Sequence, residues 1–131
     1  MITFVDTNVL LDVFLPDPQW GEKSKQALDQ AYADGSLVIN EISYAELAPQ
    51  FPEKRLLDET IKTLGLRVVL LDLESAYAAG ATWKKHLDAG GKRDRVLADF
   101  LIGAHAERIA QRLLTRDRGF YKKYFSALTI F

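Results

Sequence analysis

Short apolar runs alternate along the chain with longer stretches in which apolar residues recur every three or four positions. The apolar runs predict five strands, at about 2–5, 37–39, 68–71, 113–115 and 128–130. Apart from single threonines the runs are apolar, without sustained alternation of apolar and polar residues, which indicates burial on both faces of a sheet. This pattern is typical of a parallel sheet covered by helices.

Helical periodicity fills the segments between these runs. We expect helices over about 7–14, 22–34, 43–48, 75–87 and 94–110, and an amphipathic segment over 56–64. Pro16 stops the first helix, and Gly35 is placed to cap the second. The last helix is expected to present one apolar face made of Leu97, Leu101, Ala104 and Ile109. No repeat or long linker divides the sequence, so we expect residues 1–131 to form one α/β domain.

Composition narrows the class of protein. The 131 residues suffice to bury roughly two-thirds of the unfolded surface, and 48% apolar with 27% charged residues predict a soluble globular protein. There is no cysteine, which excludes disulfides and thiolate metal sites. The N-terminal residues lack the features of a signal peptide, and no apolar stretch approaches the ~20 residues of a membrane span. We therefore expect a cytoplasmic protein that does not enter a membrane.

Charge is distributed unevenly along the chain although the net charge is only -1. Residues 1–90 carry 8 Lys and Arg against 14 Asp and Glu, whereas residues 91–131 carry 9 against 4. A basic segment attracts phosphate, and solvated helix faces produce the same imbalance without any partner. The asymmetry alone leaves both interpretations open.

Four carboxylates stand where alternating strands and helices would gather them. Asp6 ends the first apolar run, Asp117 follows the fourth, and Glu46 and Asp99 lie inside two predicted helices. In an open parallel sheet, functional groups collect outside the carboxyl ends of the strands. Four acids in one crevice would repel one another unless a cation neutralised them. Oxygen ligands suit Mg²⁺ or Mn²⁺, so metal-assisted phosphodiester hydrolysis follows as a hypothesis.

Each acid taken singly has a plainer explanation. Asp6 would cap the helix that it precedes, Asp117 would start a turn, and Glu46 would be a solvated helix residue. Asp99 has apolar neighbours in the sequence, where a charge is more costly. Only the joint pattern of the four acids favours a functional site.

Other titratable residues fit the group less well. Asp94 precedes Asp99 by five residues, about 140° around a helix, and is better placed as an N-cap. Asp12 is interpreted as a surface acid or a supporting acid behind the site. His105 lies about 240° around the helix from Asp99, so we expect a packed or dimer-facing histidine.

The acids and their neighbours resemble a known family. Residues 5–12 (VDTNVLLD), 44–47 (YAEL), 98–106 (ADFLIGAHA) and 114–120 (LTRDRGF) have the order and spacing of a PIN-domain ribonuclease. More narrowly, they resemble the VapC-type toxins of toxin–antitoxin pairs. The likeness spans residue 3 to about residue 125, and four acid blocks in this order are far more specific than any one of them.

The resemblance implies a fold and a site. The fold would be a three-layer sandwich with a central, mainly parallel sheet of four to five strands flanked by helices. The acids that bind Mg²⁺ or Mn²⁺ and support catalysis would be Asp6, Glu46, Asp99 and Asp117. Asn8 and Thr115 match positions where the family places polar groups beside the acidic pocket.

The resemblance also implies partners. The substrate would be RNA, and a small antitoxin would block the acids with its C-terminal segment. The toxin itself would be a homodimer. Basic residues near the acids would contact the RNA backbone, namely Arg93, Arg95, Arg116 and Arg118. The same residues would equally fit ion pairs with the acidic pocket or with an acidic antitoxin tail.

Other classes of protein share parts of this pattern. A phosphatase with an aspartate nucleophile needs a second Asp two residues after the first, where this chain has Asn8. A housekeeping RNA-processing nuclease would share the same four acids. A PIN-like binding or scaffold module without turnover would not need them, so the intact acids favour an enzyme.

Overall fold

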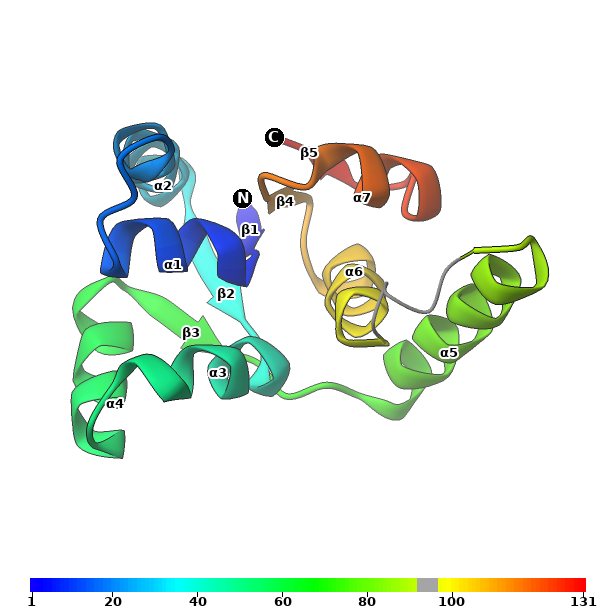
Figure 1. Cartoon of the computed structure of the whole chain (residues 1–131), viewed down its shortest axis with the longest axis horizontal. Helices are drawn as coiled ribbons and strands as arrows, with labels where there is room; N and C mark the ends of the chain where they lie inside the picture. Colours follow the sequence, from blue (N-terminus) through cyan, green and yellow to red (C-terminus); the bar gives the residue numbers. More distant parts are fainter. Residues whose placement is uncertain (92–96) are drawn as a thin grey trace.

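The computed structural model describes residues 1–91 and 97–131 (Figure 1). Strands and helices alternate along this part of the chain. Its strands are β1 (Ile2–Val5), β2 (Ser36–Ile39), β3 (Leu66–Val68), β4 (Arg112–Leu114) and β5 (Thr129–Ile130). Its helices are α1 (Thr7–Phe14), α2 (Gly21–Asp34), α3 (Glu41–Leu47), α4 (Lys54–Thr63), α5 (Leu73–Asp88), α6 (Leu97–Ile109) and α7 (Arg118–Tyr124), with a 3₁₀ turn η1 (Ala48–Gln50).

The strands form one parallel sheet in the order β3-β2-β1-β4-β5. Phe4 of the central strand β1 is in register with Val38 of β2 on one side and with Leu113 of β4 on the other. The chain adds β2 and β3 to one side of β1 and later adds β4 and β5 to the opposite side. The carboxyl ends of β1 and β4 therefore flank the point where the strand order reverses, which is where parallel sheets form binding crevices.

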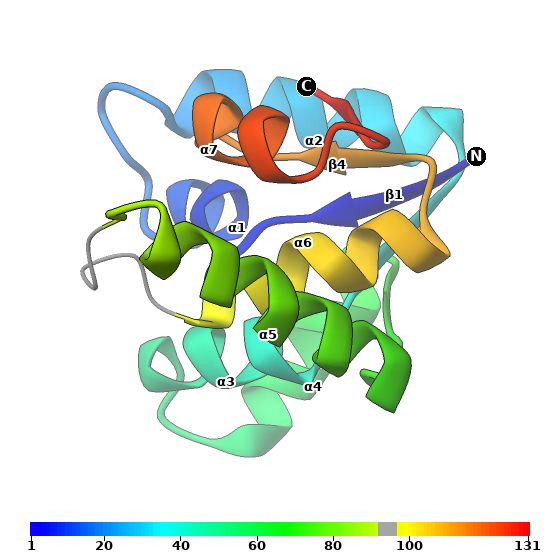
Figure 2. The ribbon, with the colours of Figure 1, turned by 90° about the vertical axis from the view of Figure 1, so that its right-hand side faces the viewer.

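Neighbouring residues on the central strands enter two different hydrophobic cores. Val5 and Leu114 pack with α1, α2, α3 and α4, whereas Phe4 and Leu113 pack with α5, α6 and α7. Figure 1 shows these two sets of helices on opposite sides of the sheet, and Figure 2 shows α5 lying across α6. The predicted three-layer sandwich is confirmed, with five strands that all run parallel.

The third strand differs from the prediction. We expected a strand at 68–71, but β3 covers Leu66–Val68 and the following apolar residues leave the sheet. Because β3 is an edge strand that pairs only with β2, it is not covered on all sides, and Leu70 is 70% exposed. A uniform apolar run therefore did not mean burial at this edge.

Helix α6 is buried on several sides, whereas the sequence predicted one buried apolar face. Phe100 and Ile102 are fully buried, whereas Leu97, expected on the buried face, is exposed. The helix lies between the sheet and α5, so several of its sides are covered (Figure 2). A Cβ atom at Gly103 would lie 2.2 Å from the ring of Phe125, so glycine lets α6 approach the end of α7. Within the described ranges, no helix is long and apolar enough to span a membrane.

Candidate active site

Asp6 is the first acid at the switch point between β1 and β4. It directly follows β1 and is the N-cap of α1, where its Oδ1 accepts a hydrogen bond from the Thr7 backbone N–H at 2.8 Å. Its Oδ2 accepts a hydrogen bond from the Thr115 hydroxyl, also at 2.8 Å, just beyond the end of β4. Asp6 thus caps α1 and also lies beside the end of β4, and it is only 5% exposed.

The environment of Asp6 favours its protonated form. Burial, followed by the charges of Asp99 and Glu46, raises the pKa of Asp6 from 3.8 to about 6. The hydrogen bonds from Thr115 and Thr7 act in the opposite direction and are outweighed. Asp6, Glu46 and Asp99 therefore lie close enough for their charges to act on one another.

Glu46 is positioned by a hydrogen bond of its own side chain and by the capped start of the helix that carries it. The Thr7 hydroxyl donates a hydrogen bond to Glu46 Oε1 at 2.8 Å, which ties α3 to the start of α1. Partial burial and then the charge of Asp99 raise the pKa of Glu46, although the Thr7 bond lowers it. The start of α3 is fixed by the buried Asn40, whose Oδ1 accepts hydrogen bonds from two backbone N–H groups of the helix.

Asn40 also joins α3 to α6, the helix that carries Asp99. Its Nδ2 lies 3.1 Å from Nδ1 of His105, which is 1% exposed. Because the amide nitrogen is a donor, Nδ1 accepts this bond and the histidine is neutral. His105 is therefore packed inside the protein, which agrees with the first of the two expectations, a packed or a dimer-facing histidine.

Asp117 lies just beyond the end of β4, at the start of α7. It is the N-cap residue of α7 but makes no side-chain capping bond, and its backbone N–H donates to the Thr115 hydroxyl at 3.0 Å. One helical turn later, burial and then the charges of Asp6, Asp99 and Asp117 raise the pKa of Tyr121. The region around the Tyr121 hydroxyl is thus bordered by three of the four predicted acids.

The donor set suits a hard cation, although the side chains do not form a closed cage. All four acids offer carboxylate oxygens, the ligand type that Mg²⁺ and Mn²⁺ prefer. A cation would also offset the burial and the repulsion between acids that together raise the pKa values of Asp6 and Glu46. Over residues 1–91 and 97–131, however, no three acidic or histidine side chains stand close enough to hold one ion as they are placed. Binding would require side-chain movement.

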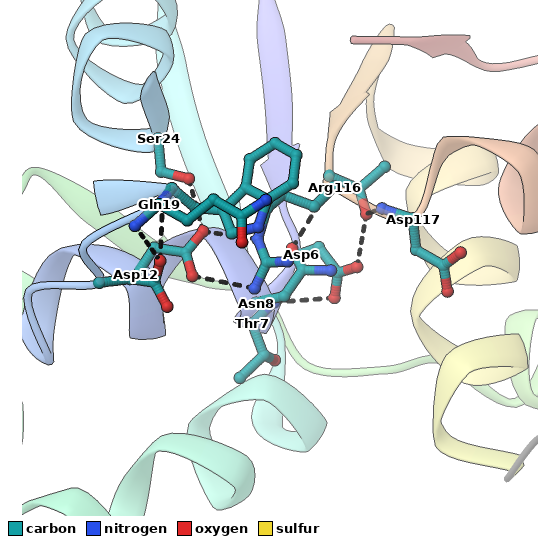
Figure 3. Close-up of polar contacts among 11 residues, drawn as sticks. Asp6, Thr7, Asn8, Asp12, Gln19, Ser24, Arg116 and Asp117 are labelled. Atoms are coloured by element: carbon teal, nitrogen blue, oxygen red, sulfur yellow. Dashed lines mark hydrogen bonds and ion pairs between the residues drawn. The ribbon is translucent and has the colours of Figure 1, made fainter. Parts of the chain in front are cut away.

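The predicted polar and basic residues lie in different situations. Asn8 Oδ1 accepts a hydrogen bond from the Arg116 backbone N–H at 3.3 Å, and the Arg116 guanidinium pairs with Asp12 (Figure 3). Arg118 is exposed and lines a pocket with Lys23 beside Thr115. The other two predicted cations, Arg93 and Arg95, lie outside the described residues.

Two residues that shape the site were given no role in the sequence analysis. One is Thr7, whose hydroxyl donates a hydrogen bond to Glu46. Tyr121 follows Asp117 by one helical turn, a spacing that offered a signal. Asp12 is 4% exposed and therefore not a surface acid, which agrees with the other interpretation, a supporting acid; its partner Arg116, 104 positions away, was not predicted. No local sequence pattern predicts a pair of residues so far apart in the chain.

Comparison with solved structures gives matches across the whole fold. The chain is similar to VapBC2 from Rickettsia felis bound to a DNA fragment from its promoter, with 18% identity and a TM-score of 0.73 over 100% of this chain and 98% of that one. It is similar to VapBC-1 from nontypeable Haemophilus influenzae, with 18% identity and a TM-score of 0.72 over 100% and 97%. It is also similar to a toxin–antitoxin complex from Klebsiella pneumoniae, with 21% identity and a TM-score of 0.68 over 97% and 95%. At these identities the matches show a shared fold.

Sequence comparison identifies the family. No curated protein matches the chain in sequence. The PIN domain family matches residues 3–126, a range that includes all four acids, the strands β2, β3 and β4 in full, and all of β1 except its first residue. This match covers nearly the whole chain. The protein therefore belongs to the PIN domain family.

Proposed function

We propose that this protein is a metal-dependent endoribonuclease and the toxin of a type II toxin–antitoxin pair. The observation that carries the proposal is the place of Asp6 at the switch point, where burial and then the charges of Asp99 and Glu46, carried by other helices, raise its pKa to about 6. Structural carboxylates are usually arranged so that the charged form is stabilised, whereas perturbed acids in a cleft are typical of functional sites. PIN domain membership and the likeness to the VapBC complexes agree with this assignment.

The chemistry would divide between the cation and the chain. A bound Mg²⁺ or Mn²⁺ would supply activation of water and stabilisation of the leaving oxygen in phosphodiester hydrolysis. The residues that would hold it are Asp6, Glu46, Asp99 and Asp117. Thr115 and Thr7 orient two of these carboxylates through hydrogen bonds of 2.8 Å each.

RNA would lie along the basic side of the site. Lys23 and Arg118 line a pocket that borders Thr115, and Asn8 lies nearby at the start of α1. Together with Arg93 and Arg95, whose positions in the sequence place them before α6, they would bind backbone phosphates. Binding of this kind weakens steeply as salt concentration rises.

The proposed protein partner is a small antitoxin. The similar structure from Klebsiella pneumoniae is named a toxin–antitoxin complex, and VapBC2 was solved bound to a DNA fragment from its promoter. By resemblance, a C-terminal antitoxin segment would cover the four acids. A toxin of this kind would meet its RNA in the cytoplasm.

A second copy of the chain is the proposed occupant of an apolar surface at the start of α5. Leu70, Leu73 and Tyr77 are 70%, 88% and 81% exposed, and the last two are one helical turn apart. Large apolar side chains gathered on a surface are typical of interfaces. We expect a homodimer that Leu73→Asp converts to a monomer in sedimentation experiments. A monomeric wild-type protein at micromolar concentration would contradict this assignment.

The nuclease proposal is tested with an RNA cleavage assay. The wild type, Asp99→Asn and the control Asp29→Asn, which changes an exposed acid on α2, are compared in Mn²⁺ and in EDTA. We expect cleavage by the wild type and by the control in Mn²⁺ only, and none by Asp99→Asn. Equal, metal-independent behaviour of all three proteins would overturn the proposal.

The outcomes also separate the alternatives. A toxin arrests growth when expressed, and Asp6→Asn or the co-expressed neighbouring antitoxin relieves the arrest. A housekeeping nuclease cuts RNA without arresting growth. A scaffold module keeps its partner in both acid variants and never cuts RNA.

A further inference from the structure

We propose that the ion pair between Asp12 and Arg116 is a positioning device for the active site, and that Arg116 serves the site in this way instead of by contact with RNA. The pair joins α1 to the segment between β4 and α7, which carries Thr115 and Asp117. Its effect on cleavage rests on the proposed function, whereas its effect on the geometry of this segment does not.

Asp12 is a buried carboxylate whose charge is fully matched. It is 4% exposed, and it accepts hydrogen bonds from Arg116 Nε to Oδ2 at 2.6 Å and from Arg116 Nη2 to Oδ1 at 2.9 Å. Ser24 of α2 donates a third hydrogen bond to Oδ2 at 2.6 Å (Figure 3). A buried carboxylate is costly unless it is paired and hydrogen-bonded in this manner. The bidentate geometry also fixes the orientation of the guanidinium.

Arg116 is held from two further directions. Its guanidinium lies over the ring of Trp20, with 5.1 Å between Cζ and the ring centroid. Its backbone N–H donates to Asn8 Oδ1 at 3.3 Å, so both the main chain and the side chain of this residue are attached to α1. Side-chain and backbone contacts together restrict the rotation of the segment.

The residues on either side of Arg116 belong to the acidic site. Thr115 donates to Asp6 at 2.8 Å and accepts from the Asp117 backbone N–H at 3.0 Å. A shift of Arg116 would therefore move the hydroxyl that orients Asp6 and the backbone that carries Asp117. The distance between these two acids is set by how the segment docks on α1.

The same contacts disfavour a phosphate-binding role for Arg116. The guanidinium face and two of its nitrogens are already engaged, and its side chain is 33% exposed. Binding a phosphate through the same fork would leave Asp12 buried without its partner, which is strongly unfavourable. Arg118, two residues later and exposed, has no such commitment among the described residues and is the better phosphate ligand.

The test compares Asp12→Asn with Arg118→Gln in the full-length protein. Asp12→Asn is the primary variant because the arginine that it releases can reach solvent, so no buried charge is left. If the ion pair positions the site, Asp12→Asn should lower kcat for RNA cleavage in Mn²⁺ about 10- to 100-fold, as small displacements of reacting groups do, and leave KM unchanged. The Arg118→Gln control should raise KM and lower the salt dependence of binding without changing kcat.

A direct RNA contact by Arg116 makes the opposite prediction. Asp12→Asn would then free the guanidinium, leaving kcat intact with KM equal or lower, and this result would overturn the proposal. The double variant Asp12→Asn/Arg116→Gln should be no less active than the less active of the two single variants, since the two residues act as one unit. Arg116→Gln alone leaves the buried Asp12 carboxylate unpaired and can prevent folding. The double variant has no such buried charge and can still be measured in that case.

Amide hydrogen exchange tests the geometry without any activity. In the metal-free protein, Asp12→Asn should speed exchange at the backbone amides of Arg116 and Asp117 and leave the β1 amides protected. Unchanged exchange at both amides overturns the positioning role even if the wild type cuts RNA. A wild type that cuts no RNA refutes the proposed function, and faster exchange in the variant still supports the positioning role.

Discussion

Replacing Asp6 by Asn should stabilise the metal-free protein at neutral and alkaline pH. Folding raises the pKa of Asp6 from 3.8 to about 6, with burial as the largest cause, so the folded state disfavours the charged carboxylate. At about 1.4 kcal/mol per pKa unit, keeping Asp6 ionised in the folded protein costs about 3 kcal/mol. The side chain is 5% exposed, so solvent screens this cost only slightly.

The sign of the pH dependence follows from proton binding. Between the two pKa values, the folded state binds more protons at Asp6 than the unfolded state does, so the stability contributed by this residue falls as pH rises through about 6. Asn keeps the acceptor for the Thr7 N–H but disturbs the hydrogen bond from Thr115, a loss of about 1 kcal/mol. We therefore expect a net gain of about 2 kcal/mol well above pH 6, and no gain or a small loss well below pH 4.

Urea denaturation in EDTA measures the free energy of unfolding of the wild type and of Asp6→Asn, once well above pH 6 and once well below pH 4. Asp29→Asn, which changes an exposed acid, is the control and should alter the free energy of unfolding by less than about 0.5 kcal/mol. Adding Mn²⁺ should stabilise the wild type and have little effect on Asp6→Asn, because a ligand of the folded state stabilises by mass action. A variant that is less stable than the wild type in EDTA at high pH would refute the reasoning.

Three further predictions concern the packing around the site. Gly103→Ala should lower stability by about 1–3 kcal/mol because its Cβ would lie 2.2 Å from the buried Phe125 ring, whereas Gly80→Ala, with no atom within 4 Å, should raise it by about 1 kcal/mol in thermal denaturation. Burial lowers the pKa of His105, so the unfolded state binds the proton more readily and the wild type should lose stability as pH falls below about 6.5. His105→Gln should make this loss smaller. An equal fall of the urea midpoint from neutral to acid pH in the wild type and in the variant would contradict this. Asn40→Ala should destabilise by about 1–2 kcal/mol through loss of the α3 cap, seen in the urea midpoint, and an unaltered midpoint would contradict the capping role.

Local patterns in the sequence were sufficient for the fold class and for most elements. The first helix occupies the predicted residues 7–14, and the parallel sheet covered by helices follows from uniformly apolar runs. Such features depend on residues a few positions apart, whose spacing is visible in the chain itself. The third strand was misplaced because edge position, which decides whether an apolar run is covered, depends on the order of strands in the sheet.

The four acids were identified from their joint order, but their physical state was not. The sequence by itself determined which two carboxylates come after strands, Asp6 and Asp117, and which two lie inside helices, Glu46 and Asp99. Only the tertiary structure decided that Asp6 is buried with a pKa of about 6, and that Glu46 is held by Thr7. Proton affinity depends on burial and on the distances to other charges, which no linear spacing specifies.

Arg116 shows the same limit most clearly. Beside Asp117 in the sequence, it is one of several cations suited to RNA, and nothing nearby in the chain distinguishes it from Arg118. The tertiary structure places it against Asp12, 104 positions away, and over the ring of Trp20. Residue types and local periodicity determine the elements and the available chemistry, whereas the docking of one element on another decides which charges meet.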